Sequence, residues 1–188
     1  MYKFNCWTNF KKLSQGHIEF IQSQKIYFVG TAASNGTVNI SPKGFNSLKV
    51  VSPTRVLWLN VTGSGNETSA HVQLNPRMTI MFTSFEGPPV TLRMYGHATV
   101  IHRLDSQWDE LYKNFDPSVG ARQIFDVKID LVQTSCGMSI PYFDYQGERD
   151  AQIKWAIKKG DNGIRQFWAD ENQISIDGFP TNILEKNT

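Results

Sequence analysis

This sequence is poor in cysteine, and that shortage argues against a disulfide-stabilised protein and against a zinc-binding protein. Among 188 residues there are two cysteines, Cys6 and Cys136, and neither has a second cysteine or a histidine at metal-ligand spacing. A zinc site and a disulfide framework are therefore not expected, and both thiols are expected to be reduced. We expect Cys136 to be a buried structural thiol, with a redox thiol facing a cofactor as the alternative.

Long apolar runs and an excess of one charge are also missing. No apolar run approaches the ~18 residues that a membrane span needs, and the start, M-Y-K-F-N-C-W-T-N-F-K-K, lacks the apolar core of a signal peptide. The 19 basic and 17 acidic residues are interspersed and give a net charge of +2. We therefore expect a cytoplasmic protein that binds neither nucleic acid nor a membrane.

Apolar residues are plentiful enough for one folded domain over residues 1–188. They make up 40% of the chain, and aromatic residues make up 12%. Six segments have the character of strands: 26–32, 38–41, 55–61, 78–84, 90–102 and 124–134. Helices are expected at 13–22, from residue 65 or 66 to 74, at 105–114, 149–159 and 163–169.

The spacing of these segments predicts the fold class. Asn35-Gly36 between two apolar runs indicates a β-hairpin. The strands follow one another too closely for a helix between each pair, which a parallel sheet would require. The prediction is a mainly β (α+β) domain, a six-stranded antiparallel barrel flanked by helices, with a helical C-terminal extension over about 142–188.

The stretch 38–68 carries the parts of a phosphate site. It contains V-N-I-S-P-K-G-F-N, with Lys43 at a strand end, and later V-T-G-S-G-N-E-T, a Gly-rich turn that opens into a helix. A helix start reached through glycines offers free N–H groups and a positive dipole end, which suit an anion. Ser64 and Glu67 stand at capping-box spacing. The alternative is a turn without a ligand, in which Ser64 only caps the helix and Glu67 competes for the same N–H groups.

Six short motifs occur in order along the chain and resemble one family. They are S-P-K-G, T-G-S-G-N-E-T, Q-T-S-C-G, G-E-R-D, W-x-x-K-K-G and S-I-D-G-x-P, beginning at Ser41, Thr62, Gln133, Gly147, Trp155 and Ser175. Together they resemble the small members of the pyridoxamine 5′-phosphate oxidase-like flavoproteins, from about residue 10 to residue 181. The resemblance implies a split β-barrel that binds flavin mononucleotide (FMN), usually at the interface of a homodimer, and an oxidoreductase of unknown substrate.

The resemblance also implies which residues contact the cofactor. The motifs and position-by-position matches give Asn39, Ser41, Lys43, Thr62, Ser64, Gly65, Asn66, Thr68 and Thr91, and the strand face described below adds Arg93. The chain departs from the oxidases where Val38 replaces an arginine and where Glu67 and Thr68 replace an Arg-Lys phosphate clamp. Lys43 and Arg93 are then the available cations, and because residues 91, 93 and 95 share one strand face, Arg93 is expected to point where Thr91 points.

The alternatives belong to other functional classes. One is a non-catalytic flavin- or haem-binding protein, and another is a barrel that has lost its cofactor. The C-terminal Trp and Arg-x-His cluster with which the oxidases grip their substrate has no counterpart here, so the substrate stays open. His71 is expected to form a surface pair with Glu67 one helical turn away, and Trp58 to lie in the core or at a dimer interface. No Ser-His-Asp order, carboxylate pair or metal motif stands out.

Overall fold

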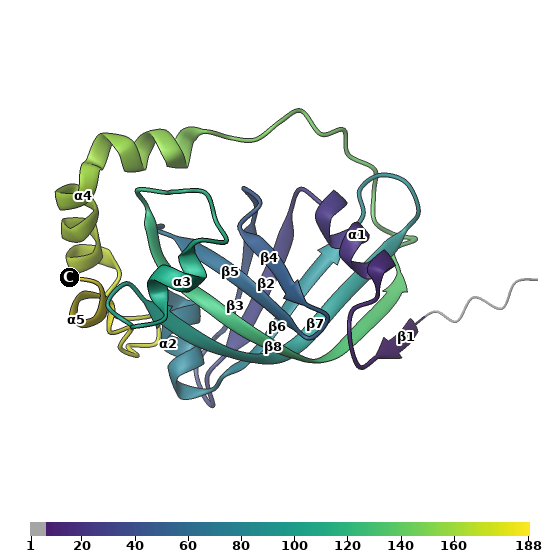
Figure 1. Cartoon of the computed structure of the whole chain (residues 1–188), viewed down its shortest axis with the longest axis horizontal. Helices are drawn as coiled ribbons and strands as arrows, with labels where there is room; N and C mark the ends of the chain where they lie inside the picture. Colours follow the sequence, from purple (N-terminus) through teal and green to yellow (C-terminus); the bar gives the residue numbers. More distant parts are fainter. Residues whose placement is uncertain (1–6) are drawn as a thin grey trace, which may run out of the picture.

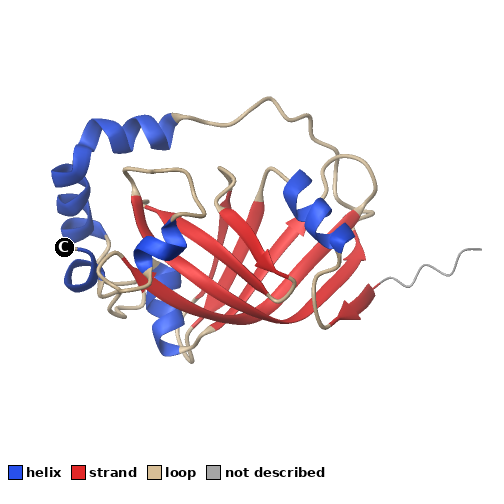
Figure 2. Ribbon diagram, viewed as in Figure 1, coloured by secondary structure: helices blue, strands red, loops and turns tan. Residues whose placement is uncertain are grey.

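Eight strands form one antiparallel sheet that curls into an open barrel (Figures 1 and 2). The computed structural model describes residues 7–188, so Cys6 lies outside the described residues. The strands are β1 (Trp7–Phe10), β2 (Tyr27–Ala32), β3 (Val38–Lys43), β4 (Leu48–Ser52), β5 (Arg55–Val61), β6 (Arg77–Thr83), β7 (Val90–His102) and β8 (Ala121–Cys136). The antiparallel barrel predicted from the sequence is confirmed.

The strand order explains why the barrel is split. It runs β3-β2-β6-β7-β8-β5-β4, with β1 added on β8. The hairpin predicted at Asn35-Gly36 joins β2 and β3, with Ala32 opposite Val38 and Gly36 in the left-handed region at φ 86°. The two end strands, β3 and β4, are consecutive in the chain and are joined by residues 44–47. The two end strands are connected in the chain but not paired with each other, so the barrel is open between β3 and β4.

The strand count is eight, where the sequence predicted six. The additional strands are β1 and β4, of four and five residues. All four residues of β1 are exposed, and β4 shows no alternation between buried and exposed positions. Neither segment has the period of two that marks a strand with one buried face, and pairing with β8 and β5 determines their conformation instead.

The sheet has an apolar core inside the barrel and a second apolar cluster outside it. Trp58 and Phe125 stack in the interior with ring centroids 4.6 Å apart. On the outer face, Leu57 and Leu59 pack with Trp108. Strand β5 is buried on both faces for this reason, and its sequence V-L-W-L reads as a continuous apolar run. The prediction of a core position for Trp58 is confirmed.

Five helices in residues 7–188 pack around the barrel (Figure 1). They are α1 (Gln15–Ser23), α2 (Glu67–Leu74), α3 (Trp108–Tyr112), α4 (Ala151–Glu171) and α5 (Ile183–Asn187). The two helices predicted at 149–159 and 163–169 are confirmed as the two halves of α4, which are separated at Gly160, whose φ of 62° interrupts the helical backbone. None of the helices in residues 7–188 has the length and apolar character that a membrane crossing requires.

An extended segment, residues 137–150, leads from β8 to α4 along one side of the barrel (Figure 2). We call it the strap. Residues 141–150 are all exposed. The Phe143 N–H donates to Phe85 O at 3.2 Å, and the two rings lie 5.1 Å apart. The strap thus carries α4 and α5 from one end of the barrel to the other, where they meet α2.

His102 connects the end of β7 to the C-terminal helix. It is fully buried, and its Nδ1 accepts a hydrogen bond from Asn187 Nδ2 at 2.8 Å. Asn187 Oδ1 accepts from the Arg103 N–H, which fixes the orientation of the amide. Since an amide nitrogen only donates, the imidazole is neutral. Burial lowers the pKa of His102 to about 4, against the opposing effect of Asp105, while Lys186 lowers it further.

This histidine predicts a loss of stability in mild acid. Below pH 6.5 the unfolded chain takes up a proton that the folded chain binds only near pH 4, so stability falls across that window. The expected loss between pH 7 and pH 4.5 is about 2 to 3 kcal/mol. Urea unfolding at both pH values measures it. In the variant His102→Gln, the free energy of unfolding should fall by about 2 to 3 kcal/mol less over the same pH interval. An equal fall in both proteins would contradict the role of His102.

Candidate cofactor site

A cavity of about 350 Å³ lies between β3, β5 and the start of α2. It brings together seven of the ten residues predicted to contact a cofactor: Asn39, Ser41, Lys43, Ser64, Gly65, Asn66 and Thr68. The remainder of its wall includes Trp58, Asn60, Glu67 and Arg122. Alternation along β3 positions residues 39, 41 and 43 on one face, opposite the exposed Val38 and Ile40. The phosphate-like motif and the strand motif thus meet in one place.

Four buried polar atoms in the wall of this cavity have no hydrogen-bond partner within the described chain. They are Ser41 Oγ, Trp58 Nε1, Asn66 Oδ1 and Arg122 Nε. A buried polar atom left unpaired costs about 1–3 kcal/mol, and native proteins rarely leave several together. Three of the four can donate a hydrogen bond and one accepts. The wall therefore matches a ligand that carries both anionic oxygens and hydroxyl groups.

Two cationic side chains share the cavity. Lys43 Nζ lies 5.1 Å from the ring centroid of Trp58. Burial, together with the charge of Arg122, lowers the pKa of Lys43 to about 8. Burial also lowers the pKa of Arg122 to about 9, although Glu67 opposes that shift. Both shifts have burial as their largest cause, and an incoming anion would stabilise the charged forms.

Arg122 was missed in the sequence, which pointed to Arg93 as the second cation. Arg122 donates from Nη2 to Gly65 O at 2.6 Å and from Nη1 to Asn172 Oδ1 at 2.7 Å. It lies at the start of β8, two residues before the strand predicted from residue 124. In the sequence, Arg122 is marked only by its position next to the apolar run I-F-D-V-K-I. The pairing of β8 with β5 brings Arg122 close to Gly65.

Thr91 and Arg93 lie outside this cavity. Their neighbours Leu92 and Met94 point into the barrel core, so residues 91 and 93 lie on the opposite face of β7. Thr91 Oγ1 contacts Thr83 Oγ1 at 3.2 Å, and Arg93 Nη1 donates to Ser135 Oγ at 3.0 Å.

Thr62 lies directly behind the Gly-rich loop. Its hydroxyl donates to Gly120 O at 2.8 Å and accepts from Trp168 Nε1 at 2.9 Å. It is buried, with 1% of its surface exposed. These contacts make Thr62 a support of the loop in this structure.

The start of α2 differs from the predicted capping box. The helix begins at Glu67 with Asn66 as its N-cap, and no side chain caps it. Glu67 Oε2 instead accepts a hydrogen bond from the Ile176 N–H at 2.9 Å. The competing carboxylate is thus held by the C-terminal extension, and the first N–H groups of the helix carry no side-chain cap.

Two further predictions are wrong. His71 is fully buried and lies 3.2 Å from Thr31 Oγ1, so it forms no surface pair with Glu67; α2 packs on β2 and encloses it. Cys136 is exposed, because it ends β8 where the strand passes into the strap. Within residues 7–188, no three metal-ligating side chains cluster.

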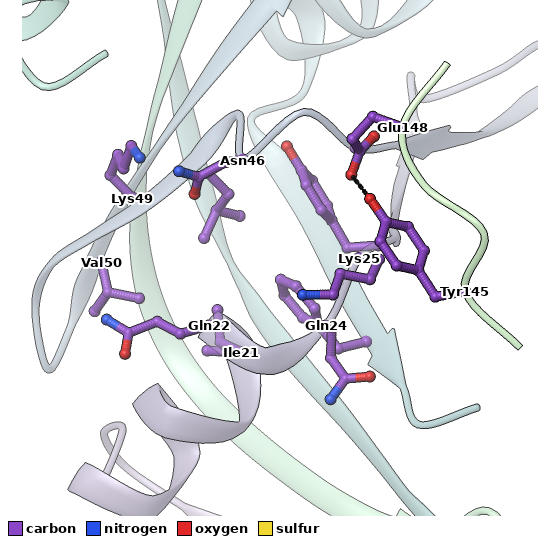
Figure 3. Close-up of a pocket in the computed structure, with 13 residues that line it drawn as sticks. Ile21, Gln22, Gln24, Lys25, Asn46, Lys49, Val50, Tyr145 and Glu148 are labelled. Atoms are coloured by element: carbon purple, nitrogen blue, oxygen red, sulfur yellow. Dashed lines mark hydrogen bonds between the residues drawn. The ribbon is translucent and has the colours of Figure 1, made fainter. Parts of the chain in front are cut away.

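A larger cavity of about 580 Å³ begins at Gly44, the residue after Lys43 (Figure 3). The end of α1, strand β4 and the strap contribute its wall. Tyr145 of the strap donates its hydroxyl hydrogen to Glu148 Oε1 at 2.8 Å, and Lys25 Nζ lies 5.5 Å from the Tyr145 ring. Lys43, at the end of β3, lines the cofactor cavity, and the next residue, Gly44, lines this second cavity, to which the strap contributes Tyr145 and Glu148.

Comparison with known proteins places this chain in a family. The sequence model of the family described as pyridoxamine 5′-phosphate oxidase matches residues 13–136. A curated relative, the pyridoxamine 5′-phosphate oxidase family protein ustO of Aspergillus flavus, is 29% identical over 191 residues, covering 91% of this chain and 76% of that protein.

Solved structures show the same fold at lower identity. A Lactobacillus delbrueckii protein described as a candidate pyridoxamine 5′-phosphate oxidase aligns with a TM-score of 0.52 and 16% identity, over 70% of this chain and 98% of its own. HupZ of Group A Streptococcus aligns with a TM-score of 0.51 and 16% identity, over 63% and 91%. The family match covers more than half of the chain, from α1 to the end of β8. The chain belongs to the pyridoxamine 5′-phosphate oxidase family.

Proposed function

We propose that this protein binds FMN in the cavity between β3, β5 and α2, and that it is an oxidoreductase. The observation that carries the proposal is the set of unpaired buried polar atoms beside two cationic side chains in one cavity. A phosphate ester bearing a hydroxylated chain satisfies both. Membership of the family supports the choice of FMN among such ligands.

The residues divide into those suited to the phosphate and those suited to the rest of the cofactor. Lys43 and Arg122 supply positive charge, and the start of α2 supplies N–H groups. Ser41 Oγ and Trp58 Nε1 can donate, while Asn66 Oδ1 can accept from a hydroxyl. These groups replace the Arg-Lys clamp that Glu67 and Thr68 do not provide.

The chemistry would come from the cofactor, because bound FMN accepts and returns electrons. The described residues hold and orient it. Trp58, stacked on Phe125, fixes one wall, and the two cationic side chains favour a negatively charged group at the phosphate end. Mixing the loaded protein with a reduced nicotinamide without oxygen, and following the loss of flavin absorbance, would separate an enzyme from a passive carrier.

Preference for FMN over riboflavin is the expected result of a titration. The two ligands differ only in the phosphate, and two charge-assisted contacts of about 1.5–3 kcal/mol each predict an affinity ratio of at least ~100. Fluorescence titration of the apo-protein with FMN, riboflavin and a deazaflavin cofactor measures it. Equal affinities would contradict the phosphate site, a Soret band in the purified protein would indicate haem, and a protein that ignores all three flavins would have lost its cofactor.

A homodimer is the expected assembly. Val38 and Ile40 on the outer face of β3 are 71% and 68% exposed, and they border an apolar groove of about 580 Å³ formed with β2, β6 and β7. Isolated domains seldom leave such a face in water. Light scattering at micromolar concentration should give twice the monomer mass of 21.4 kDa. The variant Ile40→Glu should give the monomer, and a parent protein that already scatters as a monomer would contradict the prediction.

A further inference from the structure

The C-terminal extension makes a concentrated set of hydrogen bonds to the back of the Gly-rich loop. Gln152 of α4 donates to Thr62 O at 3.1 Å, and Trp168 donates to the Thr62 hydroxyl. The Ile176 N–H holds the Glu67 carboxylate. Residues 62–67 are therefore fixed from behind by residues that lie 90 to 109 positions later in the chain.

Asn172, the C-cap of α4, is at the centre of these contacts. Its Nδ2 donates to Gly63 O at 3.0 Å and to Ser64 O at 3.2 Å. Its Oδ1 accepts from Arg122 Nη1 at 2.7 Å. Its backbone oxygen accepts from Asn66 Nδ2 at 3.3 Å. The side chain is completely buried, so none of these bonds is exchanged with bulk water.

One side chain thus connects both halves of the anion site. The amide group orients the carbonyls of Gly63 and Ser64 away from the cavity, and it holds the guanidinium of Arg122 between the same loop and α4. An amide both donates and accepts, so Asn172 can bind the loop carbonyls and Arg122 at once, whereas an ionised aspartate of similar size only accepts.

We propose that the C-terminal extension is a built part of the cofactor site and that Asn172 is its positioning residue for phosphate recognition. The proposal rests on FMN binding at the loop, as proposed above. Asn172 does not line the cavity. It acts through the loop amides and Arg122, which must keep one arrangement for a phosphate to meet N–H groups and a cation together. The motifs W-x-x-K-K-G and S-I-D-G-x-P lie on either side of Asn172 in the sequence, and both are part of this extension.

The test compares two buried asparagines of the same extension. Asn187 is 4% exposed and Asn172 is 0% exposed. Asn187 bonds to His102, Ile183 and Arg103 and makes no hydrogen bond to the Gly-rich loop. Asn172→Ala is expected to raise the Kd for FMN by about tenfold or more and that for riboflavin by less than about threefold. Asn187→Ala is expected to lower the unfolding temperature and to leave the FMN-to-riboflavin ratio unchanged.

A second substitution at the same position tests whether the effect on FMN binding follows the charge and hydrogen bonding of residue 172. Asn172→Asp retains the acceptor for Arg122, loses both donors to the loop and adds a negative charge beside Arg122, so FMN binding should weaken further than in Asn172→Ala. An unchanged ratio in Asn172→Ala, or an equal change in Asn187→Ala, would overturn the positioning role. A parent protein that binds no FMN would instead refute the proposed function, which distinguishes the two failures.

Discussion

Replacing Lys43 with methionine is expected to weaken FMN binding by about 10- to 100-fold while the folded state becomes more stable. The loss follows from one charge-assisted contact to phosphate, of about 1.5–3 kcal/mol. The gain follows from the pKa of Lys43, which burial lowers to about 8 from 10.5, so the folded protein holds the ammonium charge at a cost of up to about 3 kcal/mol at pH 7. Methionine keeps the apolar stem against Trp58.

The opposite signs make the experiment decisive, because misfolding cannot weaken binding and raise stability together. FMN affinity is measured by fluorescence quenching, and stability by urea unfolding of the apo-protein. Arg93→Met is the matched control. The Arg93 side chain lies on the outer face of β7, away from the cavity, and donates to Ser135 of β8. Its replacement should alter FMN affinity by less than about twofold. If Arg93→Met weakens FMN as much as Lys43→Met does, then Arg93 reaches the cofactor after all, as the strand-face argument from the sequence supposed.

The parts of the fold that the sequence predicts are those with a local signal. The hairpin at Asn35-Gly36 and the strand at 90–102 are set by turn chemistry and by alternation, and both are found where they were expected. β1 and β4 have no such signal, because their conformation depends on pairing with β8 and β5. The barrel class was predictable because close spacing of strands excludes crossover helices.

The residues of the site also separate into those with a local sequence signal and those without one. Residues 39–43 and 63–68 are neighbours in sequence, and motif and strand period place them correctly around the cavity. Arg122 lines the cavity and contacts Gly65, 57 positions earlier in the chain. Asn172 supports the cavity from behind and contacts Gly63, 109 positions earlier. The capping-box prediction for Ser64 was wrong because of another distant partner: the Ile176 N–H occupies the Glu67 carboxylate. A single sequence gives no register for such distant partners.

FMN affinity is also expected to fall by about tenfold between pH 7 and pH 9. In the free protein Lys43 has a pKa of about 8, and a bound phosphate dianion raises that pKa because an opposite charge favours the ammonium form. Above pH 8 the free site has lost the proton that the complex keeps, so binding must take up a proton and weakens with each added unit of pH. The phosphate itself, with a second pKa of about 6, stays doubly charged throughout this range.

Two comparisons identify the titrating group. Riboflavin, which lacks the phosphate, should bind with an affinity that hardly changes from pH 7 to pH 9, because nothing in it raises the pKa of Lys43. The Lys43→Met variant should lose the dependence for FMN as well, retaining only the contribution that Arg122, with its pKa of about 9, makes at the upper end. A parent affinity for FMN that stays flat to pH 9 would mean that Lys43 does not hold the phosphate, and a slope that persists in Lys43→Met from pH 7 would assign the proton to another group.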